Sequence, residues 1–384
     1  MPWEESRVLD QRVKFIAELL KSEESMTALC RAFGISRKTG YKWRDRYRHG
    51  GPVALIDMSR RPKVSPRATP KDLIDRILAL RAKHPTWGAR KLKVRLLQSE
   101  PQFNWPAAST IHEILRKARV TRKPRRRRVV PFRLALVEVI RPNQVWCMDF
   151  KGSFDCASGE RCDTFTVTDA FSRFILHCQA IKSLGHDDVD RICDALMRKY
   201  GIPERIRTDN GTPFSSISGL GISKLSIKWM QLGIVHERID PGKPTQNGRH
   251  ERMHRTLKED TASPPAPTLL AQQARFEEFT LSFNRERPHQ ALGMKTPLSM
   301  YSPSEKAFPA KLDAITYQEP YIVRPIRRNG TIRWKNREIF ITEVLRDQPV
   351  GLLQGSDNAL EVYFGSLHLG TVDWQSTKFI PKSL

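Results

Sequence analysis

The feature that most constrains the fold is an acidic residue inside an apolar run. Residues Val145–Phe150 read Val-Trp-Cys-Met-Asp-Phe, and an apolar run of this length is typical of a strand buried at the centre of a sheet. An ionised carboxylate in such a strand is costly unless a cation or hydrogen-bond donors meet it. The run itself supplies no partner for Asp149, so the partner comes from elsewhere, and a divalent metal ion is the leading candidate.

Two further acidic residues stand in motifs of their own. Asp209 directly follows a short predicted strand, Arg205–Thr208, and Glu251 lies in a helix predicted to begin near residue 246. Three carboxylates from two strand ends and a helix suit Mg²⁺, which takes a few carboxylate ligands and otherwise water or phosphate oxygens. Taken singly, each of them could instead be a solvated loop aspartate or a helix-surface glutamate.

With these residues in place, the sequence resembles an insertion-sequence transposase of the DDE class, whose catalytic domain is similar to retroviral integrase. The resemblance covers roughly residues 143–301. It rests on five pieces in order: Trp146-x-x-Asp149, Thr168–Phe174, Asp209-Asn210-Gly211, Glu251 with Lys258 seven residues later, and Asn284–His289. Asp-Asn-Gly alone is also a common turn, so the order of all five pieces carries the resemblance. The stretch between the second and third acids is longer than in compact members of the family.

The resemblance implies a ribonuclease-H-like core in which Asp149, Asp209 and Glu251 are catalytic and bind two Mg²⁺ (or Mn²⁺) ions. Two such ions activate the attacking oxygen and stabilise the leaving oxygen of a phosphodiester. Lys258 falls on the helix face of Glu251 and would contact DNA beside the reacting phosphate, although an ordinary surface lysine is the alternative. The sequence has no G-x-x-x-x-G-K-[ST] loop, so no nucleotide partner is expected and joining would proceed by direct transesterification.

Charge is distributed unevenly along the 384 residues. Residues 1–142 contain 34 Lys and Arg against 13 Asp and Glu, whereas residues 143–384 contain 32 against 28. A merely solubilising surface would not need this asymmetry. A basic front (residues 1–142) joined to a nearly neutral body (residues 143–384) indicates a module that binds a polyanion, attached to a catalytic module.

The basic front contains two predicted helix-turn-helix domains, at residues 1–50 and 71–120, with a Pro-rich linker at residues 51–70. In the first domain, Ser25 and Ser36 are predicted to cap two successive short helices. A helix of this kind can enter the major groove of DNA, although an ordinary helical hairpin with a charged face is the alternative. The residues of the second helix predicted to contact DNA are Arg37, Lys38, Lys42 and Arg44.

Residues 121–142 are predicted to form a basic linker arm, because the run Arg122–Arg128 is too charged to be buried. Its Arg125, Arg126, Arg127 and Arg128 are predicted to follow DNA phosphates or to enter the minor groove. A plain solvated linker is the alternative.

The remaining chain predicts two further domains. Residues 143–302 begin with three consecutive strands, which suggests an antiparallel meander, and continue with alternating helices and strands, so the predicted sheet is mixed. Residues 315–384 contain five or six short strands and suggest a small all-β barrel. Within it, the runs at 322–326 and 331–334 flank Arg328-Asn329-Gly330 and predict a hairpin. The overall prediction is therefore a multidomain protein: all-α front, α/β core and all-β end.

The cysteines and the apolar runs predict the cellular setting. Six cysteines show no C-x-x-C pair and no accompanying histidine pair, which argues against a structural zinc site. Most lie in apolar surroundings, as buried thiols of a reducing compartment do. No secretory leader opens the chain and no apolar run approaches 18 residues, so no membrane partner is expected. We expect an intracellular protein, and the resemblance implies the bacterial cytoplasm, in association with the nucleoid.

Together with the resemblance, these features predict a DNA transposase that binds the terminal inverted repeats of an insertion sequence. It would cleave the ends of the element and join their 3′-hydroxyls to target DNA, both partners being double-stranded. One active site handles one strand and an element has two ends, so a homodimer or higher homo-oligomer assembled on DNA is expected. Two alternatives are a catalytically inactive DNA-binding repressor or scaffold, and a hydrolytic nuclease of the ribonuclease-H type.

Overall fold

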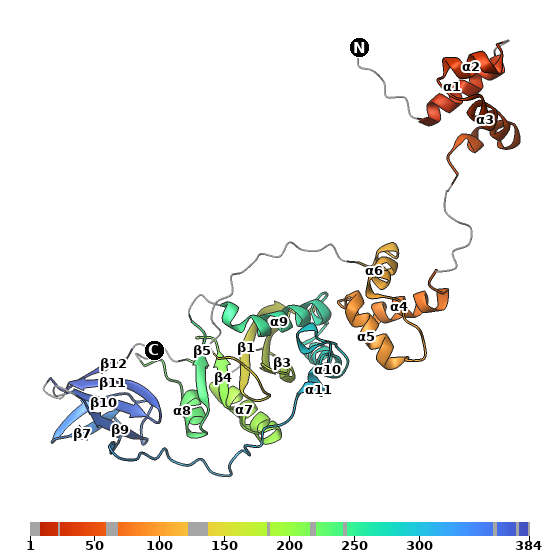
Figure 1. Ribbon diagram of the computed structural model, residues 1–384. Coiled ribbons are helices and arrows are strands. Elements are labelled where there is room, and N and C mark those ends of the chain that lie inside the picture. The colour runs from red at the N-terminus through yellow and green to blue at the C-terminus, as the bar shows by residue number, and fades with distance from the viewer. Residues whose placement is uncertain are drawn as a thin grey trace. The chain divides into compact units, whose positions relative to one another are not determined.

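A computed structural model describes most of the chain, in two compact units, Met1–Ala68 and Thr69–Leu384 (Figure 1). The described residues are 8–21, 24–58, 68–121, 137–182, 185–215, 220–240, 244–355, 359–373 and 376–382. Arg125, Arg126, Arg127 and Arg128 of the predicted basic arm lie outside them. All six cysteines are buried, and none of them forms a disulfide bond. No helix in the described part of the chain is long and apolar enough to span a bilayer.

The first unit is a small helical bundle built from locally capped helices. The hydroxyl of Ser25 accepts from the backbone N–H of Ala28, and that of Ser36 accepts from Thr39, as the sequence predicted. Leu55, in the stretch interpreted as linker, is buried in the same core. The helices are α1 (Val8–Lys21), α2 (Met26–Ala32) and α3 (Arg37–Gly50), followed by a 3₁₀ turn at Pro52–Leu55.

The second unit begins with another three-helix bundle, whose core is formed by Ile77, Trp87, Leu92 and Ile111. Its helices are α4 (Lys71–Lys83), α5 (Ala89–Ser99) and α6 (Ala108–Lys117). The predicted all-α front is therefore confirmed by two separate helical bundles.

The catalytic region is built on the predicted mixed sheet, with β1 at its centre. Its strands are β1 (Val145–Asp155), β2 (Arg161–Asp169), β3 (Ile175–Ile181), β4 (Arg205–Thr208) and β5 (Val235–Arg238). The spatial order is β3-β2-β1-β4-β5, and the first three strands are antiparallel, whereas β4 and β5 run parallel to β1. This arrangement confirms the ribonuclease-H-like core.

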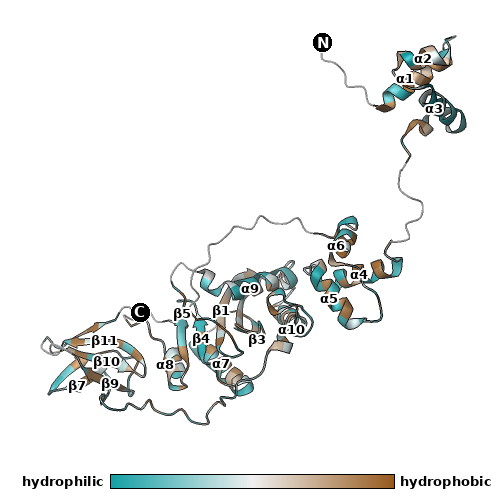
Figure 2. Ribbon diagram, in the orientation of Figure 1, coloured by the Kyte–Doolittle hydropathy of each residue, from teal (hydrophilic) through white to brown (hydrophobic). Residues whose placement is uncertain are grey.

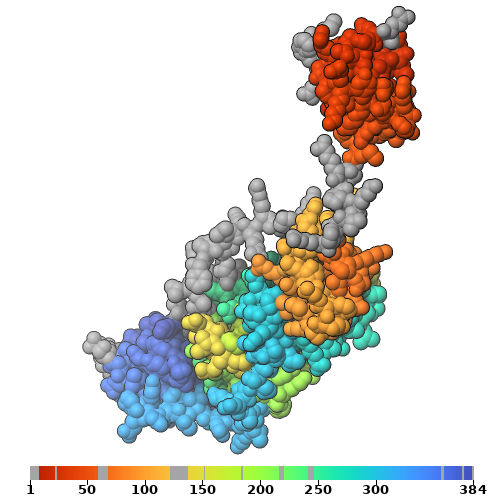
Figure 3. Space-filling model, turned by 45° about the vertical axis from the view of Figure 1, so that its right-hand side comes forward, coloured from red at the N-terminus to blue at the C-terminus, as the bar shows by residue number. Residues whose placement is uncertain are grey.

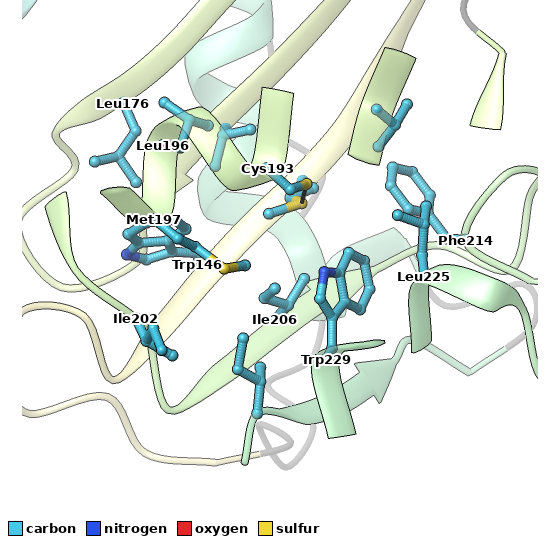
Figure 4. Packing of buried hydrophobic residues seen from close by; sticks show 14 of the residues in the cluster. Trp146, Leu176, Cys193, Leu196, Met197, Ile202, Ile206, Phe214, Leu225 and Trp229 are labelled. Atoms are coloured by element: carbon cyan, nitrogen blue, oxygen red, sulfur yellow. Dashed lines mark hydrogen bonds between the residues drawn. The ribbon is translucent and has the colours of Figure 1, made fainter. Parts of the chain in front are cut away.

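Helices cover both faces of this sheet. On one face, α7 (His186–Tyr200) and α8 (Lys224–Gln231), which carries Trp229, pack on Trp146 and Ile206 of the sheet (Figure 4). On the other face, α9 (Gly248–Thr261) and α10 (Leu269–Arg285) pack on β3. Successive side chains of a strand point to opposite faces, so Trp146 and Met148 face α7 while Asp149 faces α9. The region closes with short helical turns at Pro244–Asn247 and Gln290–Leu292, and with α11 (Pro297–Met300).

The C-terminal strands form an open sheet rather than the predicted barrel. The strands are β6 (Ile322–Pro325), β7 (Thr331–Trp334), β8 (Arg337–Phe340), β9 (Pro349–Gln354), β10 (Ala359–Phe364), β11 (Leu367–Asp373) and β12 (Lys378–Pro381). Five of them pair in the order β12-β11-β10-β9-β6, and β7 pairs only with β8 among the described strands. The edge strands β12 and β6 are not hydrogen-bonded to each other, so the barrel is not confirmed.

The predicted hairpin around Arg328-Asn329-Gly330 is also wrong. The turn forms, with the N–H of Gly330 donating to Arg327 O, but β6 pairs with β9. The hairpin instead joins β7 to β8 through Lys335 and Asn336, whose φ values are 43° and 60°. Two left-handed residues form the hairpin turn whose twist matches that of the flanking strands.

Candidate active site

Asp149 lies in β1 directly opposite Thr166 of β2, on the face of the sheet that α9 covers. Its side chain is 22% exposed, although the neighbouring Trp146 and Met148 are fully buried. The Nδ1 atom of His254 lies 3.6 Å from Asp149 Oδ2. The acid is therefore accessible from solvent and is approached by an imidazole from the covering helix.

Asp209 directly follows β4, the parallel neighbour of β1. The pairing of the two strands ends with Cys147 opposite Arg207, and Asp149 and Asp209 each follow this pair by two residues. A carboxylate oxygen of Asp209 accepts from the N–H of Gly211 at 3.0 Å, and a Cβ at Gly211 would lie 3.3 Å from the carboxylate oxygens. Glycine at this position leaves room around the acid.

Glu251 is exposed in the first turn of α9, one helical turn before His254. Residues three apart on a helix are neighbours on its surface, so Glu251 lies next to the histidine that faces Asp149. Lys258 is exposed seven residues after Glu251, two turns along the same helix. Of the three predicted acids, only Asp149 belongs to a group of possible metal ligands within 4.8 Å of one another among the described residues.

Two buried histidines fix α9 to the sheet. His250 and His254 are 1% and 2% exposed. The hydroxyl of Thr166 lies 2.7 Å from His250 Nε2 and 2.6 Å from His254 Nε2, while Thr168 Oγ1 lies 2.7 Å from His250 Nδ1. These distances fit an assignment in which Thr166 donates to His254 and accepts from His250, and Thr168 donates to His250. In that assignment His254 turns its Nδ1–H toward Asp149.

The ligand atoms of Asp149, His250 and His254 lie within 4.8 Å of one another, a spacing that a metal ion could use. Both ring nitrogens of His250 are nevertheless bonded to threonine hydroxyls, and one of His254 is bonded as well. These histidines therefore hold the helix, while the neighbouring carboxylates offer the oxygen ligands that Mg²⁺ prefers. Histidines four apart on a helix, opposite Thr-x-Thr in a strand, are a visible sequence signal of this role.

Asp169, at the turn between β2 and β3, is a further acid of the core and is fully buried. It accepts from the N–H of Asn143 at 2.8 Å, and from the N–H and hydroxyl of Ser172 at 2.7 and 2.6 Å. Burial raises the pKa of its carboxyl group, and the bonds from Ser172 and Asn143 oppose that shift. Its oxygens are occupied inside the fold, so it is not part of the exposed site.

The predicted DNA-contacting residues of α3 belong to the first unit. Arg37, Lys38 and Lys42 are exposed on a helix that is strongly hydrophilic (Figure 2). Arg44 is half-buried, where it donates to Asp45 at 2.7 Å and lies over the ring of Tyr41. Three of the four predicted side chains therefore face solvent, and the fourth is held against its own helix.

The Integrase core domain family matches residues 140–244, and a second family of that description matches residues 232–297. A Helix-turn-helix domain matches residues 11–63, and a Homeodomain-like domain matches residues 39–115. The chain therefore carries an integrase core domain together with helix-turn-helix domains, as the sequence predicted. This combination places it in the integrase and transposase class of DNA-recombination proteins.

Among particular proteins, the chain is similar to two that are encoded by insertion elements. It is 29% identical over 272 residues to the IS476 uncharacterized 39.2 kDa protein of Xanthomonas euvesicatoria, covering 70% of each chain. It is 27% identical over 230 residues to the IS407 uncharacterized 31.7 kDa protein of Burkholderia multivorans, covering 59% of this chain and 79% of that one. The HTLV-2 integrase catalytic core domain in complex with magnesium aligns at 17% identity and a TM-score of 0.33, over 43% of this chain and 99% of that one.

Proposed function

We propose that this protein is a DNA transposase that binds the terminal inverted repeats of an insertion sequence, cleaves its ends and joins the 3′-hydroxyls to target DNA. One observation carries the proposal. Asp149 lies in β1, Asp209 directly follows β4, the parallel neighbour of β1, and the helix that bears Glu251 is bonded through His254 to the strand that pairs with Asp149. We assign catalysis to these three acids.

The residues fit divalent metal binding. All three acids offer oxygen ligands, Asp149 is partly exposed in an otherwise buried stretch, and Gly211 leaves space at Asp209. Asp149, Asp209 and Glu251 would hold two Mg²⁺ or Mn²⁺ ions. When bound, such ions polarise the phosphodiester and lower the pKa of the attacking oxygen.

The chain's own residues position the reacting groups. The Thr166 hydroxyl and the two buried histidines hold α9, so Glu251 stays in register with the acids of the sheet. The ammonium of Lys258, two turns further along α9, would bind the phosphate next to the reacting one. The attacking hydroxyl belongs first to water and then to the new DNA 3′ end, and each transfer replaces one phosphodiester oxygen with another.

The basic helical front supplies DNA binding in this proposal. Arg37, Lys38 and Lys42 would contact DNA at α3, with Arg44 supporting the helix, and Arg125–Arg128 would follow the phosphates between the front and the core. We extend the first DNA-reading domain beyond residue 50, because Leu55 is part of its core. We otherwise retain the predicted division into a second helical domain, a basic arm, a core at residues 143–302 and a C-terminal β domain.

Two DNA ends require two active sites, so we propose a homodimer or higher oligomer assembled on the DNA of a bacterial cell. The concentration of positive charge in the front would oppose association of the free protein, and bound DNA would remove that repulsion.

The test uses full-length protein with pre-cleaved terminal-repeat oligonucleotides, a plasmid target and Mg²⁺ or Mn²⁺, without ATP. Covalently joined products that EDTA suppresses are expected. Asp149→Asn, Asp209→Asn and Glu251→Gln should each abolish joining while leaving end binding nearly unchanged, and Glu259→Gln on the same helix is the matched control. Joining by the Glu251→Gln protein at the control's level would remove Glu251 from the triad.

The two alternatives give different results in the same assay. Shortened oligonucleotides without joined products, across several ends and both metals, would favour a hydrolytic nuclease. Tight end binding with no metal-dependent product from the wild-type protein would favour a repressor or scaffold.

A further inference from the structure

The corner between α4 and α5 lies against the catalytic core, where α10 ends. In Figure 3 the orange atoms of this helical bundle touch the cyan atoms of α10. The carboxylate of Glu286, the residue after α10, lies 3.4 Å from a guanidinium nitrogen of Arg95 and 3.6 Å from His84 Nε2. The ammonium of Lys83 lies 4.0 Å from the same carboxylate. One core acid thus faces three basic side chains of the bundle.

A second core acid, Asp260, contacts the same corner. Thr86 donates from its hydroxyl to Asp260 Oδ2 at 3.3 Å, and Arg287 Nη1 lies 3.5 Å from that oxygen and 3.4 Å from the Thr86 hydroxyl. Arg287 is only 8% exposed, and burial lowers its pKa. The pKa of Lys91 in α5 is lowered to about 7, chiefly by burial and then by Arg287, against the opposing effect of Asp260. The contact is therefore partly buried, with charges of both signs.

This contact uses the segment Asn284–His289, which carried part of the family resemblance but has no place among the catalytic acids. It also uses the last turn of α9, the helix that carries Glu251. Asp260 follows Glu251 by nine residues, which is about 13 Å along a helix that rises 1.5 Å per residue. A bundle held at Asp260 is therefore held at a fixed distance from the third catalytic acid.

We infer that Glu286 and Asp260 are docking residues that fix the α4–α6 bundle to the end of α9, so that DNA held by the bundle reaches the active site at a set spacing. The inference deepens the proposed function and rests on it. Because Arg95 and Lys91 of α5 are engaged by the core, the bundle meets DNA through α6. That helix exposes Ser109, His112 and Lys117.

Docking can be tested on the full-length protein without DNA or metal. A water-soluble carbodiimide joins an amine to a carboxylate only where the two are in contact, forming an amide as the reagent takes up the elements of water. The expected product is a Lys83–Glu286 cross-linked peptide, identified by mass spectrometry and lost in Glu286→Gln. Glu204→Gln, which changes an exposed acid paired with Arg141, should leave its yield unchanged. Absence of the wild-type cross-link would overturn docking, whatever the protein does to DNA.

The positioning role is tested by exchanging charges. Glu286→Arg should reduce joining of pre-cleaved ends about tenfold or more and scatter the cut positions on uncleaved ends, because small misplacements of reacting groups cost large factors in rate. Arg95→Glu in the same chain should restore both, which a purely destabilising change would not allow. The control is the double variant Arg141→Glu with Glu204→Arg, which reverses the charges of another exposed ion pair and should leave joining and cutting unchanged. Unaltered joining and cutting by Glu286→Arg would contradict the positioning role.

If no variant or wild-type protein cleaves DNA, the transposase proposal fails, but the cross-link still decides whether the bundle is docked. If cleavage occurs and the cross-link does not, the docking inference fails while the proposed function stands.

Discussion

Replacing Thr166 with valine should detach α9 from the sheet without changing the volume of the core. Thr166 is completely buried, and its hydroxyl bridges the Nε2 atoms of His250 and His254 at 2.7 and 2.6 Å. Valine fills the same space but leaves two imidazole nitrogens without this partner. A buried polar group that loses its partner costs about 1–3 kcal/mol. The two rings lie 4.5 Å apart and edge to face, so they can compensate only in part.

We therefore expect Thr166→Val to lower the free energy of unfolding by about 3 kcal/mol. This figure counts two nitrogens that lose their partner and assumes that rearrangement of the rings recovers the cost of roughly one of them. A domain of this size should then melt about 6–12 °C lower. Differential scanning calorimetry of the full-length protein measures the shift, and hydrogen exchange should show faster opening of α9. End joining should fall more than end binding, because Glu251 is carried by α9.

Thr164→Val is the matched control. Thr164 lies two residues earlier on the same strand, is equally buried, and its hydroxyl has no partner of normal hydrogen-bond geometry among the described residues. This change should be neutral or slightly stabilising. If the two valine variants differ by less than about 0.5 kcal/mol, a typical error of such comparisons, the hydroxyl does not hold α9 and the reasoning is refuted.

Three further outcomes are expected. Burial lowers the pKa of His236 from 6.5 to about 3, so protonation below pH 6.5 favours the unfolded state. The free energy of unfolding should therefore fall by about 2 kcal/mol between neutral pH and pH 5. In melting curves recorded as a function of pH, His236→Gln should reduce this dependence. Gly370 has φ +151° and a Cβ there would overlap Ile380 O, so Gly370→Ala should separate β12 from β11, at a cost of about 1–3 kcal/mol, seen as faster hydrogen exchange in β12. Arg37→Ala should weaken binding to the preferred sequence by about 1–3 kcal/mol, whereas neutralising Arg125–Arg128 should weaken all sequences alike and reduce the salt dependence; equal effects of the two changes on random and terminal-repeat DNA would contradict the assignment.

The sequence by itself determined the parts of this protein that depend on neighbouring residues. The apolar run around Asp149 indicated the central strand, and the capping hydroxyls of Ser25 and Ser36 indicated where two helices begin. Both are local signals, because a strand's alternation and a helix cap are satisfied within a few residues. The mixed sheet followed from the order of strands and helices, since antiparallel neighbours need only short connections and parallel ones need a crossover.

Only the tertiary structure decided which segments meet. The turn at Gly330 was visible in the sequence, but strand pairing depends on burial against distant segments, and β6 pairs with β9. The hairpin forms instead between β7 and β8, at the two-residue turn that begins with Lys335. The bonded partners of His250 and Glu286 were likewise hidden, because one bonds a threonine more than 80 residues earlier and the other pairs with a helical bundle nearly 200 residues earlier. A sequence pattern records what each residue prefers nearby, whereas a buried hydrogen bond or ion pair also requires a distant partner, which only the folded chain supplies.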